Sequence, residues 1–247
     1  MGKEYNYDGR LIFDGKYFSK RRLKGKIYEY YKNELVFEGE YLDGKLWTGK
    51  GKKYDFKVGL IFDGEYIEGK KNGYVKVFDC FHTLEYEGQY KNGEKNGFGK
   101  DYYYNEKISY EGEFLSGEKN GYGKDYDKEG KLIFEGNYIK GERNGYGKEY
   151  YKNDLIFEGE YLNNKKWNGK VKEYESLYFR EKTLAFEGEY LNGMKNGKGK
   201  EYYENGNILF EGVYKNGERN GFGTEYNRDG NIKYIGEFLD GHRQQTE

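Results

Sequence analysis

A five-residue phrase recurs ten times in this chain: an aromatic residue, an acidic residue in nine of the copies, glycine, a variable residue and a second aromatic residue. Phe37-Glu-Gly-Glu-Tyr41 is one copy. The central glycines follow one another at intervals of 23–29 residues, at Gly15, Gly39, Gly64, Gly88, Gly112, Gly136, Gly159, Gly188, Gly212 and Gly236. A period in this range is typical of a repeat array, in which each unit buries its surface by stacking on its neighbours. We therefore expect a single array over residues 1–241, followed by a polar tail at residues 242–247.

Composition excludes several classes of protein. A hydrophobic content of only 35% with 35% charged residues would suggest disorder, but 20% of the chain is aromatic and these residues follow the period. The 43 basic and 44 acidic residues balance, which argues against a nucleic-acid partner. Cys80 is the only cysteine, and no apolar run has the length of a membrane span or a secretion signal. These features predict a cytoplasmic protein.

A second phrase follows each aromatic phrase and predicts a second strand in every unit. Gly97-Phe-Gly-Lys-Asp-Tyr102 and Gly145-Tyr-Gly-Lys-Glu-Tyr150 are examples. Both phrases alternate in polarity, and turn sequences such as Lys-Asn-Gly separate them, which is typical of hairpins. No window shows a helical period. The fold class predicted is all-β: an elongated, single-layer antiparallel meander or solenoid of about ten tandem hairpins and about twenty strands, twisted as a ribbon.

The register of the hairpins can also be predicted. If the loop is centred between Gly93 and Asn96, Tyr90 lies opposite Gly99 and Gln89 lies opposite Lys100. A ring over a cross-strand glycine would cover exposed backbone. The same construction in other units predicts a structural strip of aromatic residues and glycines, Tyr90, Phe114, Tyr138, Tyr190, Tyr214, Gly99, Gly123, Gly147, Gly199 and Gly223, which we expect to form an aromatic groove.

These residues resemble the MORN repeat, whose units have the pattern Tyr-x-Gly-x-aromatic-x-x-Gly-x-x-x-Gly-x-Gly. The match is position by position at Tyr86, Gly88, Tyr90, Gly93, Gly97 and Gly99. Eukaryotic members often carry Trp in the second aromatic position, where this chain has Tyr or Phe, so the chain is more similar to the bacterial and viral branch. The resemblance implies hairpin arrays used as scaffolds, with membrane-lipid association proposed for some members.

Interruptions of the repeat are the candidate binding sites. The longest interval, 29 residues, adds an apolar tip at Leu177, Tyr178 and Phe179, which is either a partner contact or a longer hairpin packing on itself. Trp47 and Trp167 each lie in a loop lengthened by one residue, where Trp would serve as a structural plug or as a binding residue.

The function predicted from these features is a non-catalytic protein–protein interaction scaffold for a protein partner whose identity the sequence does not reveal. No unit carries a distinct set of acid, base and nucleophile, so we expect no enzyme activity, catalytic residue or cofactor. Cys80 and His82 provide too few ligands for a metal site.

The alternative is a peripheral membrane module that associates with phospholipids. A lysine row would contact anionic lipid, while a neighbouring glutamate row would cancel most of its field. The lysines are Lys52, Lys76, Lys100, Lys124, Lys148, Lys172 and Lys200, and the glutamates are Glu40, Glu65, Glu113, Glu160 and Glu189.

Self-association is expected to use the ends of the array. The strand Tyr234–Phe238 would leave one row of backbone groups unpaired, and Ile235 replaces the usual acid there. Pairing of two such C-terminal edges would produce a homodimer.

Overall fold

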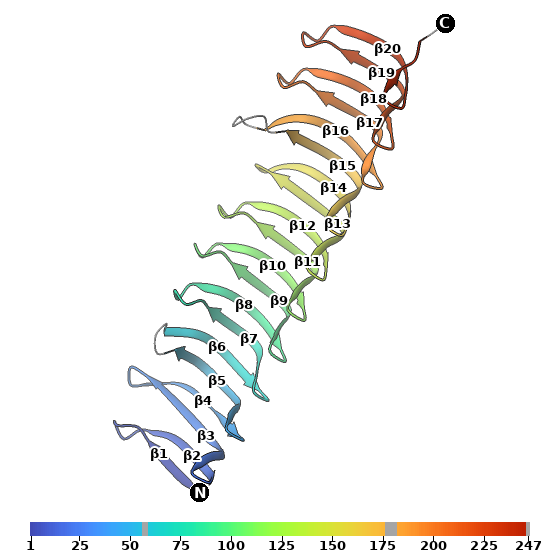
Figure 1. Ribbon diagram of the computed structural model, residues 1–247. Coiled ribbons are helices and arrows are strands. Elements are labelled where there is room, and N and C mark those ends of the chain that lie inside the picture. The colour runs from blue at the N-terminus through green and yellow to red at the C-terminus, as the bar shows by residue number, and fades with distance from the viewer. Residues whose placement is uncertain (56–58, 176–181, 246–247) are drawn as a thin grey trace. The chain divides into compact units, whose positions relative to one another are not determined.

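The structure is a computed structural model that describes residues 1–55, 59–175 and 182–245. These residues form antiparallel strands joined by turns, without a helix. The chain divides into two compact units, residues 1–130 and 131–247. In each unit every strand pairs with the strands that precede and follow it in the sequence, so both units are single-layer meanders (Figure 1). The all-β fold class predicted from the repeat is confirmed.

The described residues of the first unit form eleven strands. They are β1 (Gly2–Tyr5), β2 (Leu11–Phe18), β3 (Arg21–Tyr31), β4 (Glu34–Leu42), β5 (Lys45–Asp55), β6 (Gly59–Ile67), β7 (Lys70–Phe78), β8 (Leu84–Lys91), β9 (Glu94–Tyr102), β10 (Ile108–Leu115) and β11 (Glu118–Tyr126).

In the second unit, ten strands lie within the part of the chain that the structure describes. They are β12 (Leu132–Ile139), β13 (Glu142–Tyr151), β14 (Asp154–Leu162), β15 (Lys165–Glu175), β16 (Thr183–Leu191), β17 (Met194–Tyr202), β18 (Ile208–Lys215), β19 (Glu218–Tyr226), β20 (Ile232–Leu239) and β21 (His242–Arg243).

The register predicted for the hairpins is wrong by two residues. The β8–β9 turn consists of Asn92 and Gly93 alone, and their φ angles of 54° and 92° are those of a two-residue type I′ turn. Gly88, not Tyr90, lies opposite Gly99, because the register shifts between Gly88 and Tyr90. A ring does cover Gly99, but it belongs to Tyr86, the first aromatic residue of the phrase. A short turn followed by a bulge thus replaces the longer loop that we expected.

The two aromatic residues of each phrase form the core on one side of the sheet, which we call the aromatic face. Phe210 is 0% exposed and Tyr214 is 2% exposed, and their rings meet edge to face at 5.6 Å. A cation covers each cluster: Arg219 lies 4.3 Å from the Phe210 ring and Lys195 lies 4.0 Å from the Phe186 ring. The expected aromatic groove is therefore not open to a ligand, because its rings pack on one another beneath charged side chains.

Carboxylates of the neighbouring strands hold these cations in place. Glu201 accepts hydrogen bonds from Tyr214 Oη at 2.7 Å and from Arg219 Nε at 3.3 Å. Burial alone would raise the pKa of Glu201, but these hydrogen bonds outweigh it and the pKa lies below its usual value. The ionised form of Glu201 therefore stabilises the folded chain.

We expect Glu201→Gln to lower the stability at neutral pH and to matter less in acid. The folded pKa of Glu201 is below the unfolded value, which is ordinarily about 4.3. The stabilisation is therefore complete above that value and is lost as the pH falls through the folded pKa. Urea unfolding at several pH values measures the effect. The difference between wild type and variant should shrink towards low pH, whereas a difference that stays constant would contradict the assignment. The exposed Glu204→Gln serves as the control.

Successive hairpins are also tied together at their turns. The backbone N–H of Gly117 donates to the carbonyl of Lys95 at 2.9 Å, and Gly217 donates to Lys195 in the same way. Each turn thereby bonds to a strand of the preceding hairpin. These bonds explain why the turn residues recur with the same period as the core.

The C-terminal edge strand, which we expected to leave one row of backbone groups unpaired, is partly paired. The polar tail begins with β21, in which Arg243 pairs with Phe238 and His242 pairs with Leu239. Gln244 extends this pairing by donating its N–H to the carbonyl of Glu237. Part of β20 is thus already covered by the chain itself. Ile235 remains 52% exposed.

Candidate functional site

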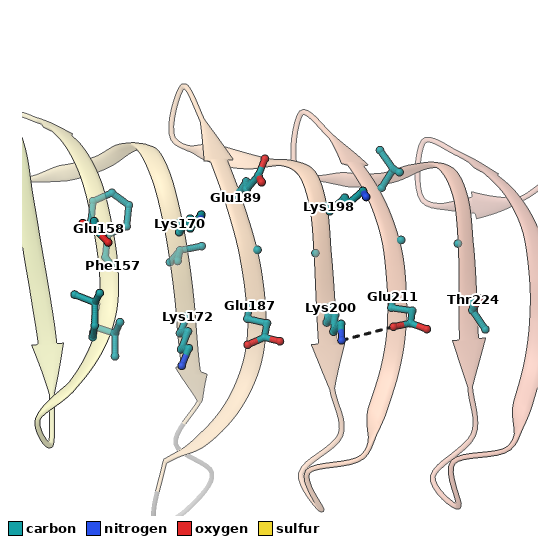
Figure 2. Close-up of a pocket in the computed structure, with 18 of the residues that line it drawn as sticks. Phe157, Glu158, Lys170, Lys172, Glu187, Glu189, Lys198, Lys200, Glu211 and Thr224 are labelled. Carbon is teal, nitrogen blue, oxygen red and sulfur yellow. Dashed lines mark ion pairs between the residues drawn. The ribbon is translucent and has the colours of Figure 1, made fainter.

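The face of the sheet opposite the aromatic core carries the acidic residues and lysines that flank the glycines of the repeated phrases, and we call it the charged face. In β16 the sequence is Glu187-Gly188-Glu189, and in β17 it is Lys198-Gly199-Lys200. Because successive side chains alternate between faces, the two charged residues of each strand point the same way on either side of a glycine. Two rows of charge therefore run across neighbouring strands, with a row of glycines between them (Figure 2).

A groove lies along this glycine row in the second unit, across β14 to β19. Its volume is about 870 Å³. The floor is formed by Gly188, Gly199, Gly212 and Gly223. Figure 2 shows one wall with Lys172, Glu187, Lys200 and Glu211, and the other with Lys170, Glu189 and Lys198.

Aromatic side chains lie over the equivalent glycines in several other repeats. Tyr146 lies opposite Glu160 in the register of β13 and β14, but its hydroxyl donates to Glu158 at 2.6 Å. The ring must cross Gly159 to reach that carboxylate, and Gly159 is buried. Tyr74 occupies the same register position, because it pairs with Gln89 next to Gly88.

Lysine replaces this aromatic residue at two consecutive hairpins of the second unit, where the groove lies. Lys170 and Lys198 occupy the positions that Tyr146 and Phe222 hold in their repeats. The following glycines, Gly188 and Gly212, are only half-buried, whereas Gly88, Gly112, Gly136 and Gly159 are buried. The groove ends where an aromatic residue returns, at Phe222.

Lysine at this position does not open the sheet in every repeat. Lys50 occupies it in β5, yet Gly64 in the next strand is buried. Lys50 forms an ion pair with Glu65 at 2.8 Å, which holds its side chain across the sheet. Lys26 occupies the same position in β3, and Gly39 in the next strand is likewise buried. Among the residues that the structure describes, Lys170 and Lys198 form no ion pair, and Gly188 and Gly212 in the strands that follow them are half-buried.

The charges of the groove alternate from strand to strand. Both walls are positive at β15 and β17 and negative at β16, which produces bands of charge across the groove. Lys200 and Glu211 are 3.8 Å apart, and Glu187 accepts a hydrogen bond from Tyr202 at 2.6 Å. In the described part of the chain, Lys172 makes no ion pair. The groove thus offers lysines and carboxylates that a ligand of complementary charge could bind.

At the groove's closed end, the pKa of Glu158 is lowered. The hydrogen bond from Tyr146 is the main cause, followed by Lys148, whose ammonium lies 3.4 Å away. Glu158 is therefore ionised at neutral pH and holds the Tyr146 ring over Gly159.

The lysine row expected from the sequence lies on this face, but its acidic neighbours differ from those predicted. Lys76 contacts Glu87 at 3.3 Å and Lys100 contacts Glu111 at 4.0 Å. Glu113, which the predicted register places opposite Lys124, pairs with Phe98, and Glu111 lies opposite Lys124. Most of the positive field is nonetheless balanced at the next strand.

The other candidate residues lie apart from the groove. Trp47 and Trp167 are strand residues in β5 and β15, not loop residues, and their carbonyls accept the turn N–H groups of Gly69 and Gly193 at 2.7 and 2.8 Å. Trp47 is 37% exposed. The proposed contact at Leu177, Tyr178 and Phe179 lies outside the described residues.

Sequence reasoning missed the groove, although one signal could have indicated it. The residue after the first glycine of the second phrase is aromatic at Tyr74, Phe98, Tyr122, Tyr146 and Phe222 and is lysine at Lys26, Lys50, Lys170 and Lys198. Without the register, nothing shows that this residue lies over the glycine of the next strand. The substitution was therefore indistinguishable from a change on a solvated surface.

The described residues contain no group of three or more His, Cys, Asp and Glu side chains arranged to hold a metal ion. No helix in the described part of the chain is long and apolar enough to cross a membrane.

Comparison with known proteins identifies one family. The MORN repeat model matches six segments, residues 62–74, 86–105, 110–124, 134–155, 186–208 and 210–232. No curated protein matches the chain.

Among solved structures, a crystal structure of TcdB2-TccC3 is 10% identical with a TM-score of 0.22, and a second one without the hypervariable C-terminal region is 12% identical with a TM-score of 0.22. The Photorhabdus luminescens Tc holotoxin pore is 11% identical with a TM-score of 0.21. Each match covers 96% of this chain but only 15–16% of the other chain. Similarity at this level carries no argument about function.

Proposed function

Because this chain is a MORN-repeat protein, we propose that it is a non-catalytic scaffold that binds an extended segment of a partner protein in the groove of the second unit. MORN repeats occur in protein-interaction and phospholipid-associating roles, and the geometry of the groove favours the first of these.

The observation that carries the proposal is the open groove between Lys170 and Phe222. It is a preformed concavity of about 870 Å³ with accessible backbone at its floor and charges on both walls. Pockets of this size hold ligands in many proteins. The groove extends over several strands and stays open to solvent on one side (Figure 2), which suits a chain segment better than a compact small molecule.

The chemistry of the lining supports a binding role. The charged groups are lysines and carboxylates, and Thr224 is the one lining residue with a hydroxyl group. Catalysis requires a nucleophile, a base and an orienting group within hydrogen-bond reach of one another, and the lining residues offer no such set. The lysines also alternate with glutamates, which weakens attraction to an anionic membrane surface within a Debye length. Phospholipid association is therefore the second candidate.

Filling the groove with the chain's own aromatic residue tests the proposal. We expect Lys170→Tyr combined with Lys198→Tyr to abolish binding of peptides that are selected on the wild-type protein from a random phage-displayed library. The new rings would cover Gly188 and Gly212 as Tyr146 covers Gly159. Binding is measured by fluorescence anisotropy with the selected peptides. The variant should unfold within about 0.5 kcal/mol of wild type, as is usual for surface substitutions.

The matched control is Lys26→Tyr combined with Lys50→Tyr, which makes the same change at equivalent positions of the first unit. This control should keep peptide binding. Peptides that bind both double variants equally would contradict the groove as the site. Flotation on phosphatidylserine vesicles that persists at physiological salt and depends on the headgroup would instead favour the phospholipid role.

A further inference from the structure

We infer that the segment bound in the groove is a polyproline II helix with a charge period of three residues. This inference rests on the proposed scaffold function and specifies the chemistry of its partner. Three features of the groove carry it: its width, its closed floor and the spacing of its charge bands.

The width excludes an α-helix. The two walls are formed by residues that are two positions apart in one strand, such as Lys198 and Lys200, with a single glycine between them. Two strand positions span roughly 6.6–6.8 Å, whereas a helix with its side chains is about 10–12 Å wide. Only an extended chain can reach the glycine floor.

The floor excludes an added β-strand. Gly199 pairs with Gly188 on one side and with Gly212 on the other, and Gly212 also pairs with Gly223. Each floor strand thus has a neighbour on both edges, and its backbone donors and acceptors are used within the sheet. A ligand in the groove cannot extend the sheet, so the charged walls must position it.

The spacing of the charges distinguishes the remaining conformations. Strands lie about 4.7–4.9 Å apart, so bands of the same sign, such as those at β15 and β17, recur every 9.4–9.8 Å. A polyproline II helix has three residues per turn and advances about 9.3 Å per turn. In an extended β-strand, side chains on one side recur every 6.6–6.8 Å, roughly. This repeat does not match the spacing of the charge bands, so the second charge of such a strand would already miss its band. Charges at every third residue of a polyproline II helix would therefore meet successive bands.

Apolar residues at the ends of the groove suit the uncharged positions of such a helix. Phe222 is 59% exposed and Val213 is 37% exposed at one end, and Leu155 is 38% exposed near the other. Grooves that bind polyproline II segments commonly use aromatic side chains as their contact surface. The sequence itself contains no proline, so a second copy of these residues is not the source of a proline-rich ligand.

Two peptides of identical composition test the inference. One repeats Glu-Pro-Lys four times, and the other has two Glu-Pro-Glu triplets followed by two Lys-Pro-Lys triplets. Both keep proline at the same positions, so both favour the same backbone, and only the charge period differs. We expect the periodic peptide to bind about tenfold more tightly, a difference of about 1.4 kcal/mol. Fluorescence anisotropy at low and physiological salt measures this preference.

The double variant Lys170→Tyr, Lys198→Tyr should remove the preference, because it fills the groove and deletes half of the lysines on its walls. Equal binding of both peptides to the wild-type protein would overturn the inference. If library-selected peptides still require the open groove in that case, the scaffold function stands and only the ligand class is wrong. If no selected peptide distinguishes the wild type from the filled groove, the scaffold function itself fails.

Discussion

Phe210→Ala should lower the free energy of unfolding by about 3–5 kcal/mol, the usual cost of removing a buried phenylalanine. The Phe210 side chain is 0% exposed and packs edge to face against Tyr214 and Phe238, at 5.6 and 5.0 Å. Arg219 covers the ring at 4.3 Å and would lose this cation–π contact as well. Glycines flank the ring at Gly212 and Gly223, so no neighbouring side chain can move into the space from those positions.

The loss of stability caused by Phe210→Ala should be confined to the neighbouring hairpins, because in a repeat array each repeat contacts mainly its neighbours. Urea unfolding measures the total effect, and hydrogen exchange locates it. Amides of β18, β19 and β20 should exchange faster, whereas those of β2 to β5 should keep their protection. Leu191→Ala is the control, because Leu191 is 48% exposed and its truncation should change stability by less than about 0.5 kcal/mol. Equal loss of protection in both units would show that the array unfolds as one cooperative body.

Gly123→Val should destabilise the protein by about 1–3 kcal/mol, although valine is the better strand former. A Cβ at Gly123 would lie 2.3–2.5 Å from the hydroxyl oxygen and two ring carbons of Tyr110. That ring is 1% exposed and its hydroxyl is bonded to the carbonyl of Glu113 at 3.0 Å, so it cannot move aside freely. Chemical denaturation measures the loss.

A double-mutant cycle separates this clash from a general effect of valine. In a Tyr110→Leu background the ring is absent, so Gly123→Val should cost less than it does in the wild type. Costs that are equal in the two backgrounds would mean that the Tyr110 ring is not what requires glycine at this position.

Much of the fold could be predicted because the sequence repeats its local signals. The alternation of Phe157, Gly159 and Tyr161 with Glu158 and Glu160 specifies which side chains share a face, since a strand has a period of two. Ten copies of one phrase made the hairpin array the consistent solution. Phe13, Phe134 and Phe210 each hold the first aromatic position of their phrase, and each is 0% exposed, as this alternation predicts for the core face.

The exact pairing of the strands could not be predicted in the same way. Asn92 and Gly93 form a turn of only two residues, and Gly97 adopts a φ of +93° near the bulge that follows. Several turn lengths are compatible with the sequence Lys-Asn-Gly-Glu-Lys-Asn-Gly, and each of them shifts the register. The sequence therefore predicts that Tyr90 covers Gly99, whereas in the structure Tyr86 covers it.

The sequence by itself determined the repeat, the hairpin architecture and the aromatic core, because each depends on residues close together in the chain. Only the tertiary structure decided which face is open. The aromatic residues expected to line a groove are packed beneath Lys and Arg side chains, while the charged face opens where Lys170 and Lys198 replace a ring. The position of the open face depends on which glycine of the next strand each side chain covers. This is set by the pairing of the strands, which the sequence alone did not reveal.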